Sequence, residues 1–546
     1  VTTTLIAALQ SELVGLKAEM GTKVATLEET IANLAHENAL LKRRLFGNKT
    51  ERSHTSEAQL AFGDMLAAEK RLQKELDEAI AKTKAEAGVA GQEPGTPGER
   101  KKPKGRRNLL ASNLPRYEVE ILDQELETRG CRRIGFEDSA QLMFRRGGFA
   151  VLVKRVARYE VVKDGAATVV AVPSPETLFP RGLLHTSTVA HLAVSKFALG
   201  VPHYRLERDV ADQGVALDRG TMSRYVEHAG NTLGATIVEA MWADAIAHAQ
   251  VISTDATGAL IQPAKVAGND RAQACKKGHF FTAVVDCDAI LFAYVEHHSS
   301  EAVQRLFGKF SGFLQADASN VYDILDRGPP VDGDEGVSLV GCWAHLRRYM
   351  FEAAICRYPV GLQGLMRIRA IYAAEDAVGR APATERGALR ERHVRPLMTS
   401  FFDWVRSVRD KTPGRNLATK AIGYAVNQEA ELLRVLDDIN LPLDNTRSER
   451  ALRKIVVGRK AWMFYGSDTH AEAAAAIFSI IASCRLHRID PFTYLDETLR
   501  ILPYWPRERY LELAPKHWST TRARLRPEEL AVPLSAFEVP PVAPVA

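Results

Sequence analysis

Long apolar runs are missing from this 546-residue sequence, and cysteine is scarce. No stretch of about 18 apolar residues occurs, so we expect no membrane span. The first residues lack the basic-then-apolar pattern of a signal peptide, and we expect a cytoplasmic protein. The six cysteines form no Cys-x-x-Cys pair. This excludes a disulfide framework and favours a reducing compartment without a zinc knuckle.

The composition is that of an ordinary globular protein. Hydrophobic residues make up 46% and charged residues 25% of the chain. A chain of this length predicts roughly three or four domains. The net charge of +5 is too small to demonstrate a nucleic-acid partner by itself.

A seven-residue repeat marks the N-terminal part, residues 1–83. Apolar residues recur in one register at Ile6, Leu13, Met20, Leu27, Leu34 and Leu41. Four residues after the later ones lie Val24, Ile31, Asn38 and Leu45, so the pattern predicts a coiled coil with a polar residue, Asn38, at a core position. We therefore expect a homodimer or higher homo-oligomer; the alternative is one amphipathic helix packed on its own protein.

A flexible basic linker is expected over residues 84–114. Proline and glycine at 94–98 cannot continue a helix. Six basic residues follow: Arg100, Lys101, Lys102, Lys104, Arg106 and Arg107. Such a run can neutralise DNA phosphates without reading sequence. A solvated linker that contacts nothing is an equal alternative.

Two small regions are expected next. Alternating apolar residues predict a β-rich module over 115–180, and residues 181–246 turn helical. Tyr204 to Gln213 predicts one helix, Gly214 a turn, and Asp218 the cap of a second helix. This spacing is typical of a helix-turn-helix with Arg219, Ser223 and Arg224 facing a DNA groove. An ordinary helical hairpin is the alternative.

The strand order predicts a ribonuclease-H-like α/β core in residues 247–349 and 441–500. Two of its strands end in an acid, Asp255 and Asp317. Functional groups gather at strand ends in mixed sheets. Residues 501–546 are assigned to a C-terminal tail.

Carboxylates at neighbouring strand ends suit Mg²⁺, which prefers oxygen ligands. Glu449, early in a helix, is the candidate for a third carboxylate. The same helix carries bases that can hold a DNA backbone: Arg450, Arg453, Arg459 and Lys460. Solvated surface acids are the alternative for each carboxylate taken singly.

The chain resembles the bacterial insertion sequence 66 family of transposases. The likeness is strongest in residues 314–317 (LQAD), 339–348 (LVGCWAHLRR) and 443–453 (LDNTRSERALR). It continues in 458–462 (GRKAW) and 466–468 (GSD), and more weakly in 194–197, 204–205 and 43–47.

This resemblance implies a DDE transposase. By motif match, Asp255, Asp317 and Glu449 take the three catalytic and metal-binding positions, with two Mg²⁺ ions or Mn²⁺ as cofactor. It further implies an all-helical insertion over 350–440, a stretch that is itself helix-prone. His345 would lie near the catalytic pocket and contact the scissile phosphate; a His on an ordinary first helical turn is the alternative.

The sequence also departs from the family. Ala256 follows Asp255 where family members usually carry a second acid. The family's zinc module has two Cys-x-x-Cys pairs, of which only Cys131 remains here. We therefore expect a degenerate module and no zinc.

The hypothesis that follows is a transposase that cuts the ends of a mobile element and joins the new 3′-hydroxyl to target DNA. Its expected partners are the element's terminal inverted repeats, target DNA and accessory proteins of the same element, in the nucleoid. Two alternatives stay open. One is a nuclease of the same fold that only hydrolyses DNA, and the other is a decayed DNA-binding regulator.

Overall fold

The computed structural model describes residues 109, 114–163, 166–173, 175–263, 274–326, 336–530 and 537–542. All of them belong to the compact unit Asn108–Ala546. The expected coiled coil of residues 1–83 and the linker bases Arg100 to Arg107 lie outside the described residues. No described helix is both long and apolar enough to cross a membrane.

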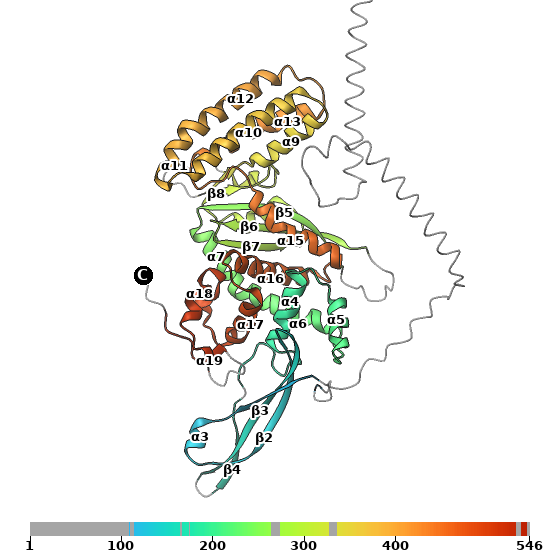
Figure 1. Ribbon diagram of the computed structural model, residues 1–546, viewed down its shortest axis with the longest axis vertical. Helices are drawn as coiled ribbons and strands as arrows, with labels where there is room; N and C mark the ends of the chain where they lie inside the picture. Colours follow the sequence, from blue (N-terminus) through green and yellow to red (C-terminus); the bar gives the residue numbers. More distant parts are fainter. Residues whose placement is uncertain are drawn as a thin grey trace, which may run out of the picture. The chain divides into compact units, whose positions relative to one another are not determined.

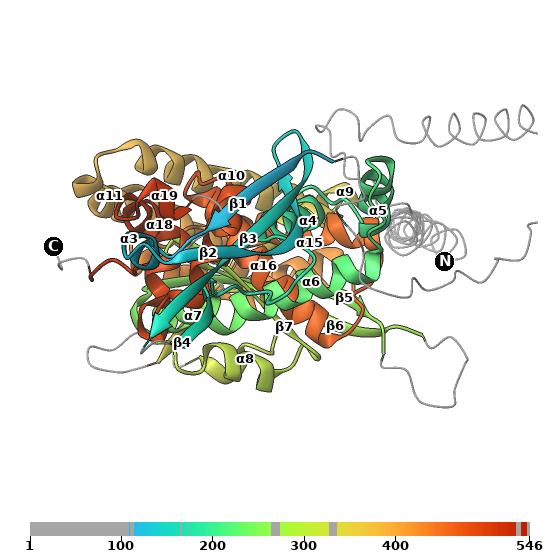
Figure 2. The same ribbon diagram turned by 90° about the horizontal axis from the view of Figure 1, so that it is seen from below.

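A twisted β-ribbon begins the described chain. Its strands β2 and β3 pair antiparallel along their whole length, while β1 and β4 share the other edge of β3 (Figure 2). Cys131 packs beside a small buried cluster formed by Ala157, Tyr159 and Val161. The elements are β1 (Arg116–Ile121), α3 (Gln124–Thr128), β2 (Arg132–Arg145), β3 (Gly148–Lys163) and β4 (Ala166–Ala171).

Helices follow the ribbon. Asp218 caps α6 by accepting the Thr221 N–H at 2.9 Å, and Gly214 (φ +84°) makes the turn before it. The predicted helix, turn and capped helix are confirmed as secondary structure. The elements are α4 (Thr186–Phe197), α5 (His203–Asp212), α6 (Arg219–Leu233), the π-helical η2 (Gly234–Val238) and α7 (Glu239–His248).

A five-stranded mixed sheet forms the centre, in the order β7-β6-β5-β8-β9. Strand β5 pairs antiparallel with β6 and parallel with β8, which in turn is parallel to β9. Its elements are β5 (Val251–Ile261), β6 (Lys276–Val285), β7 (Ala289–Val295), α8 (Ser300–Phe307), β8 (Gly312–Gln315), η3 (Asp323–Leu325), β9 (Val337–Val340) and α9 (Trp343–Ile355).

A helical subdomain follows α9 (Figure 1). Its helices share a buried core with α9 and with Val251 of β5 and Val340 of β9. Trp343, fully buried, donates its indole N–H to the Leu432 carbonyl at 3.0 Å and packs edge-on against Phe401 and Phe402. Its elements are α10 (Pro359–Arg380), α11 (Ala383–Leu389), η4 (Arg390–Val394), α12 (Arg395–Arg409), α13 (Leu417–Asn427), α14 (Glu429–Leu433) and η5 (Arg434–Leu436).

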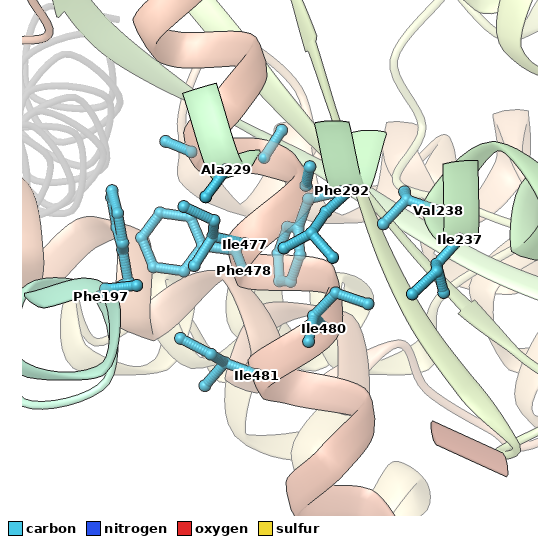
Figure 3. Packing of buried hydrophobic residues seen from close by; sticks show 14 of the residues in the cluster. Phe197, Ala229, Ile237, Val238, Phe292, Ile477, Phe478, Ile480 and Ile481 are labelled. Atoms are coloured by element: carbon cyan, nitrogen blue, oxygen red, sulfur yellow. The ribbon is translucent and has the colours of Figure 1, made fainter. Parts of the chain in front are cut away.

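The chain then returns to the sheet. The long α16 is buried on several sides and packs its Phe478 against Phe197 and Phe292 (Figure 3). The returning elements are α15 (Thr446–Trp462), α16 (Asp468–Leu486), α17 (Pro491–Ile501), η6 (Leu502–Tyr504), η7 (Arg507–Leu513), α18 (Pro515–Ala523) and α19 (Pro527–Leu530).

The C-terminal segment differs from the expected tail. Trp505, Leu513, Trp518 and Leu525 are all buried in the main core. Their apolar side chains recur on short helices that fold back against the rest of the unit. Pro506 directly precedes η7 and Pro515 is the first residue of α18, positions where a missing N–H costs nothing.

Helices α6 and α16 approach each other closely at Gly230. A Cβ placed there would lie 2.5 Å from the Ala473 carbonyl oxygen, so we expect Gly230→Ala to lower the free energy of unfolding by about 1–3 kcal/mol. The matched control is Gly423→Ala, inside α13, where an added Cβ meets nothing within 4 Å. There the better helix propensity should stabilise by up to about 1 kcal/mol. Urea unfolding of both variants checks the opposite signs.

Candidate active site

The parallel pairing of β5 and β8, two inner strands of the sheet, brings two acids to the same level. Ser253 on β5 stands opposite Gln315 on β8. Two residues after each of these come Asp255, inside β5, and Asp317, just past the end of β8, so the two acids lie level with each other. The predicted strand end at Asp255 is wrong, because β5 stays paired with β6 as far as Ile261. The charge of Asp317 raises the pKa of Asp255, as expected for neighbouring carboxylates.

The start of helix α15 is hydrogen-bonded to β5 by two side chains. Asn445 donates its amide N–H to the Thr254 carbonyl, and the Ser448 hydroxyl donates to the Ser253 carbonyl at 2.8 Å. The next residue after Ser448 is Glu449. Glu449 therefore directly follows a residue whose side chain is hydrogen-bonded to the strand that carries Asp255.

Buried polar contacts hold the segment that leads into α15. The fully buried Gln315 accepts from the Ser253 hydroxyl at 3.2 Å and donates to the Pro442 carbonyl at 2.7 Å. The Trp343 N–H donates to the Leu443 carbonyl at 3.0 Å. Strands β5 and β8, helix α9 and the entry of α15 thus form one hydrogen-bonded assembly.

The electrostatics of the site are dominated by burial and like charge. The pKa of Asp255 is raised to about 7: burial contributes most and the charges of Asp317 and Glu449 add to it, while the Ala256 N–H and Arg348 oppose the rise. Because Asp255 is hard to ionise in this surrounding, a bound positive charge would stabilise its carboxylate form. This donor set of carboxylate oxygens fits a hard divalent cation.

His345 lies beside Glu449, with Nε2 3.7 Å from the Glu449 Oε1. The imidazole is buried, and its Nδ1 has no hydrogen-bond partner in the described part of the chain. Burial, followed by the charge of Arg348, lowers its pKa, so it is neutral near pH 7. A neutral imidazole next to a carboxylate can donate or accept one proton at the site.

Cys342 and His345 form a Cys-x-x-His pair, but only His345 lies beside Glu449, whereas Cys342 packs in the interior. Cys342 is fully buried, and its sulfur accepts the Asn445 N–H at 3.3 Å. Burial raises the pKa of its thiol to about 11, so it stays protonated and packs as a structural residue. Within the described ranges, no three His, Cys, Asp or Glu side chains are arranged to hold a metal ion. The carboxylates would have to draw closer together to share one.

Two neighbours of the site were not singled out from the sequence. Arg348 lies one helical turn after His345, and its positive charge lowers the pKa of both His345 and Asp255. Tyr322 is fully buried; burial and the charge of Asp317 raise its pKa. The spacing of three residues from His345 is the signal that could have identified Arg348, whereas nothing local marks Tyr322.

The predicted DNA-contacting residues of the described chain fall into two groups. Arg450 and Arg453 are exposed on α15 beyond Glu449, and Lys460 is exposed at its end. Arg459 is half-buried and its guanidinium donates to Gly258 and Thr257 of β5, a position that holds the helix to the sheet. Arg219 and Ser223 line a cavity, and Arg224 donates to the Thr221 hydroxyl at 3.0 Å.

We expect His345→Ala to lower any DNA cleavage by about 10²-fold, the usual size of a single proton-transfer or hydrogen-bonding contribution. His345→Gln, which can still donate one hydrogen bond, should recover part of the loss. His393→Ala, at an exposed histidine of η4, is the matched control and should leave the rate unchanged. Full activity of the alanine variant would remove His345 from the site.

Comparison with known protein families identifies the class of protein that has this mixed sheet, with acids on it and a basic helix beside it. A family model described as "Transposase IS66 family" matches residues 181–473. Models described as "Transposase C of IS166 homeodomain" and "IS66 C-terminal element" match residues 33–119 and 479–516. The chain belongs to the IS66 family of transposases.

Full-length relatives are similar to this chain but carry no described activity. Uncharacterized protein y4qI of Sinorhizobium fredii (strain NBRC 101917 / NGR234) is 26% identical over 529 residues, which cover 93% of this chain and 92% of the relative. Uncharacterized protein y4jD of the same organism is 26% identical over 503 residues, 87% of this chain and 92% of its own. No solved structure matches the chain.

Proposed function

We propose that this transposase has a ribonuclease-H-like core and cuts and joins DNA by a DDE mechanism at Asp255, Asp317 and Glu449. The central observation is how the elements that carry these acids are joined: β5 pairs in parallel with β8, and Asn445 and Ser448 bond the start of α15 to β5. The raised pKa of Asp255, caused first by burial and then by the charges of Asp317 and Glu449, supports the same assignment. The strand order, in which β5 pairs antiparallel with β6 and parallel with β8, supports the fold assignment.

The three carboxylates would hold divalent cations, Mg²⁺ or Mn²⁺. Such ions, when bound, stabilise the attacking and leaving oxygens of an in-line phosphoryl displacement. The departure at Ala256 leaves this set complete, because the missing acid is not one of the three.

The chain's own groups have the remaining tasks. Arg450 and Arg453, exposed on α15, would pair with DNA phosphates and align the strand along the helix. His345 would hydrogen-bond to the scissile phosphate from beside Glu449, and Arg348 would add positive charge where negative charge develops in the transition state. Most of the rate then comes from positioning and charge stabilisation, without a covalent protein intermediate.

The test uses the full chain and a plasmid that carries the element with its own ends. We expect nicked ends with free 3′-hydroxyls and joined strands, both dependent on Mg²⁺ or Mn²⁺. Glu449→Gln should abolish both products while the affinity for DNA in EDTA is kept. Glu385→Gln, at an exposed acid of α11, should behave as wild type.

Each other outcome decides against part of the proposal. Cleavage without joined strands would indicate a nuclease of the same fold. DNA binding without any metal-dependent cleavage would indicate a regulator. Normal joining by Glu449→Gln would remove Glu449 from the catalytic set, and Asp444, whose carboxylate accepts from the Tyr372 hydroxyl at 2.9 Å, would be the next candidate.

A further inference from the structure

A cavity of about 280 Å³ opens between α4, α5, α6, α16 and the 464–466 segment. Its walls include Lys196, His203, Arg219, Ser223, Phe464 and His470. An engineered cavity of about 150 Å³ is large enough for benzene. This cavity therefore has room for a substituted aromatic ring the size of a nucleobase.

The cavity contains a cation that no acid neutralises. Lys196 forms no ion pair or hydrogen bond from its side chain within the described ranges, and its ammonium group lies only over the rings of Phe197 and Trp462, at 5.3 and 5.6 Å. Burial lowers its pKa to about 8, so it remains mostly charged at neutral pH. The acid in the wall, Glu227, is engaged by His470 at 3.1 Å and by the Thr469 hydroxyl at 3.0 Å.

A buried ring nitrogen adds a second unsatisfied group. His203 is only 9% exposed, and its Nε2 has no hydrogen-bond partner in the described structure. Burial lowers its pKa to about 3, so the ring is neutral. A neutral imidazole, a hydroxyl from Ser223 and aromatic faces are suited to a heterocyclic base.

A strained turn at Met463 directly precedes Phe464, which lines the cavity. Met463 has φ +68° and ψ −49°, and the Phe464 N–H donates to the Trp462 carbonyl at 2.8 Å, which defines a γ-turn. The turn cannot relax freely, because Tyr465 is bonded on both sides to the end of β5. It exposes two apolar side chains, Met463 at 69% and Phe464 at 42%. Strain and exposed apolar groups together mark functional contacts.

The turn lies on the expected path of the DNA. It ends the same helix that carries Glu449, about 20 Å away along the axis from Glu449 to Trp462. The exposed bases Arg450, Arg453 and Lys454 lie between the two points. A strand that follows this face passes the turn roughly six nucleotides from the reacting phosphate.

We propose that this cavity receives one unpaired nucleotide of the bound DNA, with its base against Phe464 and the histidine rings and its phosphate between Lys196 and Arg219. Met463 fills the space that the base leaves in the stack, as apolar wedges do in kinked duplexes. Base stacking on an aromatic ring and pairing of a phosphate with a lysine need no particular sequence. The inference rests on the proposed function, since it takes DNA as the substrate.

The test compares two DNA duplexes of equal sequence, one fully paired and one with a single bulged 2-aminopurine. The full chain is titrated against each in EDTA at fixed salt, so that no cleavage occurs. We expect about tenfold tighter binding of the bulged duplex and a fall in 2-aminopurine fluorescence as the base stacks in the cavity. Phe464→Ala and Lys196→Met should each bring the affinity ratio close to one and leave binding of the paired duplex unchanged.

The matched controls are Phe351→Ala and Lys411→Met, which remove an exposed phenylalanine and an exposed lysine elsewhere and should keep the preference. If Lys196→Met does not fold, Phe464→Ala decides, because its ring is partly exposed. Equal affinity of the wild-type chain for both duplexes, or a preference that survives Phe464→Ala, overturns the inference but leaves metal-dependent cleavage as it was. Binding of neither duplex overturns both the inference and the proposed function.

Discussion

Asp255→Asn should abolish DNA cleavage and joining, with a loss of about 10³-fold or more in rate, because charge stabilisation by a bound cation contributes at least that much. The variant should still bind DNA in EDTA with wild-type affinity, since Arg450 and Arg453 are untouched. Gel assays of nicked and joined products, together with binding in EDTA, check both parts. The matched control is Asp376→Asn, at an exposed acid of α10.

The same substitution should raise the thermal stability of the metal-free protein. Burial raises the pKa of Asp255 from 3.8 to about 7, so its ionised form is disfavoured in the folded state. Sites that bind charge strongly are often arranged at a cost in stability. Above pH 7 the carboxylate is ionised in both states and the native protein bears the full penalty; below about pH 4 it is protonated in both and the penalty vanishes.

The gain in Tm of Asp255→Asn over wild type, measured in EDTA, should therefore be largest at pH 8 and negligible at pH 4. Adding Mg²⁺ at pH 8 should raise the Tm of wild type and leave that of the variant unchanged. A lower Tm for Asp255→Asn than for wild type at pH 8 would contradict the proposed crowding of charge.

Arg390→Met should be the most destabilising of the substitutions considered, by about 3–5 kcal/mol, because it leaves a partly buried carboxylate and several carbonyls without their donor. Arg390 is only 4% exposed and makes a two-pronged pair with Glu375 of α10. Its guanidinium also donates to the carbonyls of Val435, Asp438 and Leu441, at 2.9 to 3.1 Å. Urea and thermal unfolding measure the loss.

The consequence for activity follows from where those carbonyls lie. They belong to the segment that leads directly into Leu443 and the start of α15, so Arg390 fixes the entry of the helix that carries Glu449. We expect cleavage by Arg390→Met to fall even at temperatures where the protein remains folded. This fall would make the helical subdomain a positioning element for the site.

Two further variants separate the buried pair from ordinary surface charge. Arg395→Met breaks an exposed pair with Glu391 on the same stretch and should change stability by at most about 0.5–1 kcal/mol. Combining Arg390→Met with Glu375→Leu removes both buried charges and should recover part of the loss. Equal effects of Arg390→Met and Arg395→Met would show that the carbonyl contacts of Arg390 contribute little.

Local patterns were enough to locate much of this chain's secondary structure. The Asp218 cap, the Gly214 turn and the strand before Asp317 depend on residues within one or two turns of each other, and the structure confirms them. The predicted strand end at Asp255 is wrong, because antiparallel pairing with β6 carries β5 on to Ile261. The C-terminal segment, assigned to a tail from the sequence, carries short helices, and the burial of Trp505 and Trp518 depends on helices far away in the sequence.

The sequence by itself determined the family motifs and the candidate residues of the site: the acids after two β-prone runs and the bases of one helix. Only the tertiary structure decided how they meet. Asn445 bonds to a residue of β5 that lies 191 positions away in the sequence, and Ser448 bonds to the residue before it, so the start of α15 is joined to the strand that carries Asp255. The same holds for the cavity at Lys196, whose walls come from four helices. These contacts and this cavity depend on packing between segments that are distant in the sequence, and no periodicity or spacing along the chain encodes them directly.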